Sequence, residues 1–271
     1  MRMLGDLALQ TYWLAMQAAR PLLPLFIARR ERAGKEDGLR HQERLGHTDA
    51  ERPEGPLAWV HAASVGETNA VLPLCTALTE RGFTVLITTV TTTAAQTMAD
   101  KTSDHAGIVH QYAPLDVPSI VQKFLDHWQP SLAIFAESEI WPMTIKALSA
   151  RSIPSAIVNG RMSDRSFRRW RKFKSATPSL FGRIDQVLVR GEEDLLRFQE
   201  LGAAKIAITG NLKYDSPAAK IDPEQLSKLQ RDIGQRPVFL ATSTHRGEDE
   251  IVLQAHAILQ KAHPNLLTCI I

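Results

Sequence analysis

Short apolar runs alternate with segments of helical character along most of this 271-residue chain. Continuous apolar runs bounded by polar turns are typical of strands that are buried on both faces of a sheet. We expect strands at Leu57–Ala62, Thr84–Thr89, Gly107–Tyr112, Leu132–Ala136, Ser155–Asn159, Gln186–Arg190 and Lys205–Thr209. The helical segments fall at Thr68–Arg81, Ala94–Lys101, Pro118–Trp128, Pro142–Arg151, Arg165–Leu180 and Glu192–Leu201. Strands separated by helices predict an α/β fold with a parallel sheet and right-handed crossovers.

The alternation restarts after a turn-rich segment at residues 210–222. A helix at Pro223–Ile233 is followed by a strand at Pro237–Thr242, a turn at Ser243–Glu248, a helix at Glu248–Ala262 and a strand at Asn265–Ile271. So few elements cannot cover both faces of a sheet. We therefore expect the start of a second α/β domain, of which this sequence holds only part.

The N-terminal residues differ from the rest. Leu7–Ala19 carries no charge, Pro21–Ile27 continues the apolar character, and Arg29, Arg30 and Arg32 follow. A spanning helix needs about 20 mainly apolar residues, and the prolines make this segment marginal. We expect residues 1–30 to form a membrane-anchor helix, interfacial or shallowly inserted, with the arginines on the cytoplasmic side. The alternative is a helix packed on the protein body. Polar residues 31–56 are expected to form a linker, or a short helix with loops.

Composition narrows the class of protein. The net charge is +3 and the pI is about 8.9, a mild excess that does not indicate a nucleic-acid partner. The two cysteines lie in apolar surroundings, which suggests reduced thiols in a cytoplasmic compartment. The sequence has no G-x-G-x-x-G, P-loop or G-x-S-x-G motif, and no Cys/His spacing of a zinc site. We expect neither a metal nor a cofactor.

Acidic residues follow two of the predicted strands. Glu67 lies in a glycine-containing turn after the first strand, where ligands bind in α/β folds. It equally suits the first turn of a helix, where the helix dipole favours an acid. Glu137 and Glu139 close another strand, just before a helix that Pro142 opens. One of these acids could be a simple helix cap, but two neighbouring like charges are less easily explained that way.

Three further segments could bind anions. Lys213, with Asn211, lies at the expected domain junction, although a solvated lysine is the simpler interpretation. Ser243–Glu248 opens a helix and suits a phosphate, or an ordinary capping box. Arg161–Lys174 holds seven basic residues and an aromatic residue at every third position from Phe167. It could contact anionic lipid headgroups or a phosphorylated substrate, or be a solvated helix with an aromatic core face.

Five ordered blocks together resemble bacterial Kdo transferases, which move 3-deoxy-D-manno-octulosonic acid (Kdo) from CMP-Kdo to a lipid A precursor. The blocks are His61–Glu67, Ala136–Pro142, Asn159–Ser163, Gly210–Asp215 and Ala241–Glu248. The resemblance covers nearly the whole chain. It implies a GT-B fold with two Rossmann-like domains, an acceptor-binding N-terminal domain over residues 57–212 and the start of a nucleotide-sugar-binding domain over residues 213–271.

The resemblance also assigns roles. Glu67 matches the general base, and Glu137 and Lys213 match positions that stabilise the transition state. The substrate-binding residues expected from the blocks are Ser64, Gly66, Arg161, Asn211, Ser243, Thr244, His245 and Gly247. The implied partners are the donor CMP-Kdo, the acceptor lipid IVA and the anionic cytoplasmic face of the inner membrane, with no metal ion. The family's main CMP-binding blocks lie beyond residue 271, so we expect residues 1–271 alone to be inactive. Two alternatives stay open, another GT-B nucleotide-sugar enzyme and a non-catalytic lipid-binding module.

Overall fold

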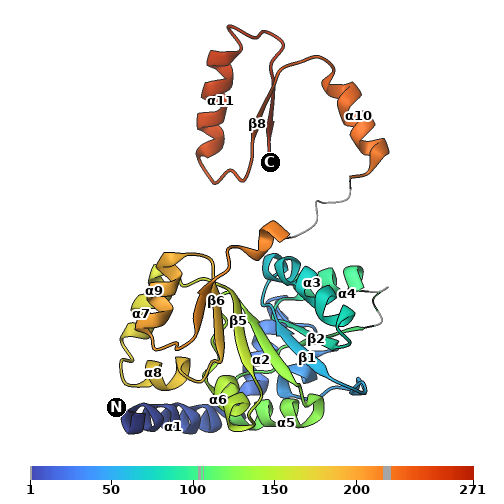
Figure 1. Cartoon of the computed structure of the whole chain (residues 1–271). Helices are drawn as coiled ribbons and strands as arrows, with labels where there is room; N and C mark the ends of the chain where they lie inside the picture. The colour runs from blue at the N-terminus through green and yellow to red at the C-terminus, as the bar shows by residue number, and fades with distance from the viewer. Residues whose placement is uncertain (1, 103–104, 106, 216–220) are drawn as a thin grey trace. The chain divides into compact units, whose positions relative to one another are not determined.

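The computed structural model describes residues 2–102, 105, 107–215 and 221–271. The chain divides into two compact units, Met1–Ser216 and Pro217–Ile271, and each is described by itself. The first unit is built on a parallel sheet with the strand order β3-β2-β1-β4-β5-β6-β7 (Figure 1). Its strands are β1 (Leu57–His61), β2 (Thr84–Thr89), β3 (Ile108–Tyr112), β4 (Leu132–Ala136), β5 (Ser155–Gly160), β6 (Gln186–Val189) and β7 (Ile206–Ile208).

Helices connect the strands. Before the sheet come α1 (Arg2–Ala19), η1 (Arg20–Leu22), α2 (Leu23–Arg32) and η2 (His41–Leu45). The crossover and terminal helices are α3 (Val65–Glu80), α4 (Thr92–Thr102), α5 (Pro118–Trp128), α6 (Pro142–Ala150), α7 (Asp164–Arg171), α8 (Ala176–Phe181), α9 (Glu192–Glu200) and η3 (Leu212–Asp215). The apolar runs predicted as strands therefore correspond to β1–β7, with bounds that differ by two residues at most.

The continuous apolar character of the strands has a direct structural cause. Alternate side chains of a strand point to opposite faces of the sheet, and both faces carry a hydrophobic core. Trp59 belongs to the core on one face, with Phe124 and Phe135, and Val60 to the core on the other face, with Ile87. All five residues of β1 are buried, as expected for a parallel sheet that is covered on both sides.

The predicted helix at Arg165–Leu180 is wrong in one respect. The structure divides it into α7 and α8, with turns between them. Pro178 has no N–H for the carbonyl of Lys174, and its ring would clash with that carbonyl in a continuous helix. The chain instead closes a turn, in which the N–H groups of Ala176 and Thr177 bond to the carbonyl of Phe173.

The N-terminal helix packs on the first unit. Gly5 of α1 allows α1 and α8 to approach closely. A Cβ at this position would lie 2.3 Å from the carbonyl oxygen of Ser175, the N-cap residue of α8, so a larger residue would clash there. Leu9 joins the main core, and Asp6 pairs with Arg183 at 2.7 Å. Figure 1 shows α1 lying along α8. Within the described residues, no helix combines the length and the apolar character needed to span a bilayer.

Residues 31–56, expected as a linker, contain a segment that is bound tightly to the sheet. Arg44 and Glu36 are both buried and form an ion pair. The Arg44 guanidinium also donates to main-chain carbonyls that follow β2 and β3, among them the carbonyl of Ala113 at 3.2 Å. Arg44 of this segment thus supplies hydrogen-bond donors to carbonyl groups at the ends of these strands. Its charges are therefore part of the packing.

The second unit holds α10 (Pro223–Ile233), β8 (Val238–Ala241), α11 (Glu248–Leu259) and β9 (Leu267–Ile270). Strands β8 and β9 pair in parallel, with Val238 opposite Leu267, so this unit is a βαβ arrangement as the sequence predicts. The expected boundary before residue 213 lies slightly further along the chain, because η3, which contains Lys213, belongs to the first unit.

Candidate active site

The candidate site lies at the carboxyl ends of the strands in the first unit. The strand order reverses direction between β1 and β4. The loops that leave these two neighbouring strands turn to opposite faces of the sheet, and ligands bind in the crevice that opens there. Glu67 comes from the loop and helix after β1, and Glu137 and Glu139 come from the loop after β4. The topology therefore brings together acids that are 70 residues apart in the sequence.

Glu67 lies in the first turn of α3, and its hydrogen bonds form a capping box. Ser64 is the N-cap residue, and its side-chain oxygen accepts from the Glu67 N–H. In return, the Glu67 carboxylate accepts from the Ser64 hydroxyl at 2.9 Å and from the Ala63 N–H at 2.8 Å. The carboxylate is thus held in a fixed position at the crevice. Gly66, beside it, is exposed and a Cβ there would meet open space.

The electrostatics of Glu67 go beyond those of a helix cap. Burial raises the pKa of the Glu67 carboxyl above its usual range, and the hydrogen bonds from Ala63 and Ser64 oppose that shift only partly. The nearby charges of Glu139 and Glu137 raise the pKa further. A carboxylate whose proton affinity is increased in this way is a better base than an exposed one.

Glu137 lies directly after β4 in a left-handed backbone conformation, with φ of 55°. Such a conformation is unfavourable for a residue with a side chain and persists only where the surroundings hold it. The Glu137 N–H donates to the Val158 carbonyl at 2.9 Å, and its carboxylate forms an ion pair with Arg190. The ammonium of Lys213 lies 3.8 Å from the same carboxylate oxygen. An anion thus lies between two cations at the strand ends.

Asn159 and Arg190 were not among the site residues expected from the sequence, although Asn159 opens one of the five blocks. Asn159 is buried at the end of β5, and its side-chain oxygen accepts from Arg190 Nε at 3.1 Å and from the Leu212 N–H at 3.2 Å. Asn159 therefore links Arg190 to the segment that carries Lys213. Both residues stand at the ends of predicted strands, which is the signal that could have identified them. Arg161, which was selected from the same block, is exposed.

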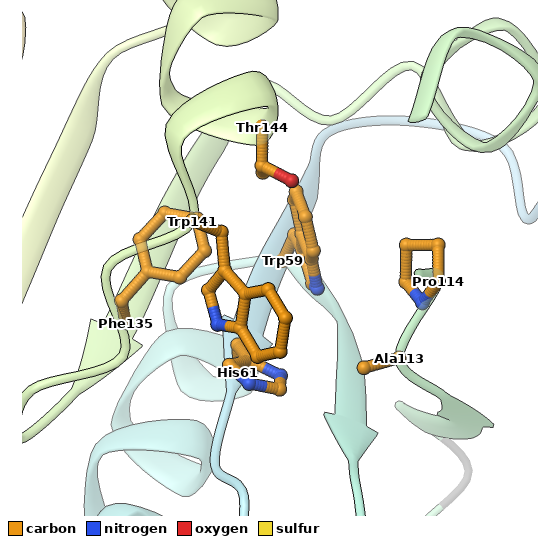
Figure 2. A pocket seen from close by; sticks show the side chains of 7 residues that line it. All are labelled: Trp59, His61, Ala113, Pro114, Phe135, Trp141 and Thr144. Atoms are coloured by element: carbon orange, nitrogen blue, oxygen red, sulfur yellow. The ribbon is translucent and has the colours of Figure 1, made fainter. Parts of the chain in front are cut away.

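Glu139 points toward a second group of side chains. One of its carboxylate oxygens accepts from the Trp141 indole N–H at 3.0 Å and lies 3.5 Å from His61 Nε2. His61 is buried at 2% exposure, and its Nδ1 lies 2.9 Å from the Thr88 hydroxyl. Figure 2 shows His61 and Trp141 lining a small pocket with Trp59 and Phe135. The histidine was part of the first sequence block but had not been assigned a role.

Asn211 and Lys213 are joined by a local turn. The Lys213 N–H donates to the Asn211 side-chain oxygen at 3.1 Å, which fixes the backbone where the lysine side chain leaves it. The residues expected from the last block, Ser243, Thr244, His245 and Gly247, belong to the second unit. There Glu248 accepts from the His245 N–H at 2.8 Å, and Gly247 is the N-cap of α11. Helix α11 therefore does not begin with the Ser or Thr cap that a capping box requires.

A metal site would need several ligands within reach of one point. Among the described residues, no three His, Cys, Asp or Glu side chains are grouped so that they could hold a metal ion. The positive charge beside the Glu137 carboxylate comes from two side chains of the protein, those of Arg190 and Lys213.

A family model of 3-deoxy-D-manno-octulosonic-acid transferase (kdotransferase) matches residues 39–216. The chain belongs to the Kdo transferase family. The matched range begins at the segment that contains Arg44 and ends with the first unit, so it includes Glu67, Glu137 and Lys213. This finding confirms the resemblance that the sequence blocks indicated.

Curated relatives agree with this assignment. The chain is 34% identical over 277 residues to a probable mitochondrial 3-deoxy-D-manno-octulosonic acid transferase of Arabidopsis thaliana, covering 99% of the chain and 62% of that protein. It is 35% identical over 234 residues to a 3-deoxy-D-manno-octulosonic acid transferase of Haemophilus influenzae, covering 83% of the chain and 53% of that protein. The chain thus spans roughly half of the length of the curated relatives it matches.

Solved structures with a similar fold are of the GT-B type. A UDP-GlcNAc 2-epimerase from Neisseria meningitidis, bound to UDP-GlcNAc, matches with a TM-score of 0.55 at 14% identity, over 80% of this chain and 65% of that one. A UDP-N-acetylglucosamine 2-epimerase described as putative, from Listeria monocytogenes, matches with a TM-score of 0.54 at 12% identity. This match covers 80% of this chain and 62% of that one. At such low identities the similarity shows the fold alone.

Proposed function

We propose that the protein transfers Kdo from CMP-Kdo to lipid IVA, a step of lipopolysaccharide core biosynthesis, with Glu67 as the general base. Membership of the Kdo transferase family supports the reaction. The observation that carries the role of Glu67 is its position: a half-buried carboxylate with a raised pKa, held at the switch point of the sheet beside Glu137 and Glu139.

The proposed reaction is a displacement at the anomeric carbon of Kdo. The acceptor hydroxyl oxygen attacks this carbon, the bond from the carbon to the CMP phosphate oxygen breaks, and that oxygen keeps the electron pair. Glu67 takes the proton from the hydroxyl, which is a weak nucleophile while it remains protonated. General-base assistance of this kind is worth about 10²–10⁴ in rate.

Glu137 and Lys213 suit the charges that develop during this step. Positive charge accumulates on the sugar as the leaving group departs, and the Glu137 carboxylate is an anion held rigidly at the crevice. Negative charge accumulates on the departing phosphate, and Lys213 is a cation with its side chain half exposed. We propose that the enzyme works without a metal ion, with Lys213 supplying the charge that meets the phosphate.

We further propose that the first unit lies on the anionic cytoplasmic face of the inner membrane. On α1 and α2, large apolar side chains such as Leu14, Leu25 and Phe26 are exposed. Arg29 and Arg32 follow in the last turn of α2. An apolar surface that is flanked by arginines is typical of helices that lie in the membrane interface. The acceptor is itself a lipid, so this position would bring the enzyme to its substrate.

Two experiments test the function. The full-length protein is incubated with CMP-Kdo and lipid IVA, and the products are followed by mass spectrometry. We expect transfer of Kdo, and its loss in Glu67→Gln. Transfer from a UDP- or GDP-sugar in place of CMP-Kdo would instead support another GT-B nucleotide-sugar enzyme. For the membrane, co-sedimentation with vesicles of phosphatidylglycerol should exceed co-sedimentation with phosphatidylcholine vesicles. Equal or no sedimentation would contradict the interfacial position.

A further inference from the structure

An apolar groove lies in the first unit, beside the candidate active site. It is lined by α1, the start of α6 and the segment from α7 to α8, is partly open to solvent, and has a volume of about 490 Å³. Its walls include the aromatic side chains of Tyr12, Trp141, Trp170 and Phe173. A volume of this order is typical of small-molecule sites, which are mainly apolar with few polar groups.

Part of this apolar surface is exposed at Phe173. Phe167 and Trp170, the preceding aromatic residues of the basic segment, pack against the main core. Phe173 lines the groove and remains 56% exposed. The Tyr12 hydroxyl is neutral at physiological pH, as that of any ordinary tyrosine is, and burial with the nearby charge of Asp116 raises its pKa further, to about 12. The groove is therefore suited to an apolar ligand.

The lining of the groove includes a positive charge. Arg169 is exposed, and among the described residues that line the groove it is the one with a formal charge. Its neighbours on α7 include Arg165 and Arg168. Among the residues that the structure describes, the ion pairs of this helix join Arg171 to Glu200 and Asp164 to Arg197. The guanidinium of Arg169 can thus meet a phosphate, for which its planar fork of donors is well suited.

Trp141 connects the groove to the candidate active site. Its ring lines both the groove and the small pocket beside His61 (Figure 2), and its indole N–H donates to Glu139 at 3.0 Å. Glu139 in turn raises the pKa of Glu67. A ligand with its apolar part in the groove would therefore have its polar end near the acids. On the other side, α1 forms a wall of the groove and exposes Leu7 and Leu14.

We propose that this groove binds an acyl chain of the lipid acceptor, with Arg169 contacting a phosphate of the same molecule. The proposal rests on the proposed function for the identity of the acceptor. In this proposal the groove holds one fatty chain. The length of the chain and the presence of the phosphate then contribute separately to the affinity.

Binding of alkyl phosphates to residues 1–271 tests the groove directly, by titration below the micelle concentration. Burying one methylene is worth about fourfold in affinity, so decyl phosphate, with two more methylenes, should bind about fifteenfold tighter than octyl phosphate, and methyl phosphate should not bind measurably. Equal affinity for all three would overturn the proposal, since it would indicate a site for phosphate alone. Failure of decyl phosphate to bind would overturn it as well.

Variants locate the site. Ala8→Phe should fill the groove and weaken decyl phosphate binding at least tenfold. The matched control is Ala15→Phe, the same change at an exposed position of α1 outside the groove lining, with an expected effect below twofold. Phe173→Ser is a second test in case Ala8→Phe does not fold, because the Phe173 side chain is exposed. It should weaken decyl phosphate binding severalfold. Unchanged affinity in both groove variants would refute the location. Arg169→Gln should weaken decyl phosphate but leave the uncharged decyl maltoside unaffected.

A transfer assay separates this proposal from the proposed function. In the full-length protein, Ala8→Phe should raise KM for the acylated acceptor and leave kcat, and the reaction with a deacylated acceptor, unchanged. If the wild-type protein transfers no Kdo, the proposed function fails, while the alkyl phosphate data still decide whether the groove binds a chain. If transfer is normal and Ala8→Phe affects neither KM nor binding, the groove proposal fails alone.

Discussion

Glu67→Gln offers the sharpest test of the candidate site, because it should separate activity from stability. The amide oxygen of glutamine can accept from the Ala63 N–H, and its NH₂ group can donate to the Ser64 hydroxyl oxygen. The capping box therefore survives the change. What is lost is the ability to take a proton. If Glu67 is the base, the rate should fall by about 10²–10⁴, which corresponds to about 2.7–5.4 kcal/mol of transition-state stabilisation.

Stability should change in the opposite sense. Burial first, and then the charges of Glu139 and Glu137, raise the folded-state pKa of Glu67 above its unfolded value. Between these two pKa values the folded state holds more protons than the unfolded state, so stability falls as the pH rises through the raised pKa. Glutamine carries no charge at any pH. Glu67→Gln should therefore be as stable as the wild type at low pH and at least as stable at pH 8.

The assays are Kdo transfer by the full-length protein and urea denaturation at pH 5 and pH 8. In the wild type, the acid limb of kcat/KM should lie above the usual glutamate pKa of about 4.3, because the base must be ionised. Activity within tenfold of the wild type in Glu67→Gln would refute the role of Glu67 as base. A strong loss of stability at both pH values would instead make Glu67 a structural cap.

Three other changes test separate parts of the structure. Lys213→Met should lower kcat about 10²-fold without altering the melting temperature, because the ammonium is half exposed and lies 3.8 Å from its partner Glu137; a wild-type kcat would exclude it from the chemistry. Asp116→Ala should cost about 1–3 kcal/mol in urea denaturation, because the buried N–H groups that Asp116 accepts from at the start of α6 lose their partner; an unchanged midpoint would refute this. Gly5→Val should release α1 from α8, because its side chain would overlap the Ser175 carbonyl, and amide exchange in α1 should rise while exchange in β1 stays constant.

The strands and most helices could be predicted from the sequence because their signals are local. Buried parallel strands need apolar side chains on both faces, so β1 and β4 are visible as apolar runs. Pro118 and Pro142, the first residues of α5 and α6, mark the first turns of these helices. The break between α7 and α8 also had a local signal in Pro178, which the aromatic periodicity of the segment obscured.

The acids of the candidate site could be selected from the sequence because each follows a strand, and ligands bind at strand ends in such folds. The sequence could not supply Arg190 as the partner of Glu137, nor Asn159 as the partner of Arg190. That choice depends on the strand order, which places the ends of β4, β5 and β6 side by side. The role of Arg44 was hidden for the same reason, since its acceptors lie at the ends of two other strands.

The sequence by itself determined the elements, the parallel sheet and the family, because these depend on side-chain period and on the order of short blocks. Only the tertiary structure decided the environment of Glu67. Ser64 and Ala63, which hold the carboxylate in position, are its near neighbours in the sequence. Its raised pKa, in contrast, comes from burial and from two acids that belong to another loop. Proton affinity depends on distance and burial, and neither exists until the chain has folded.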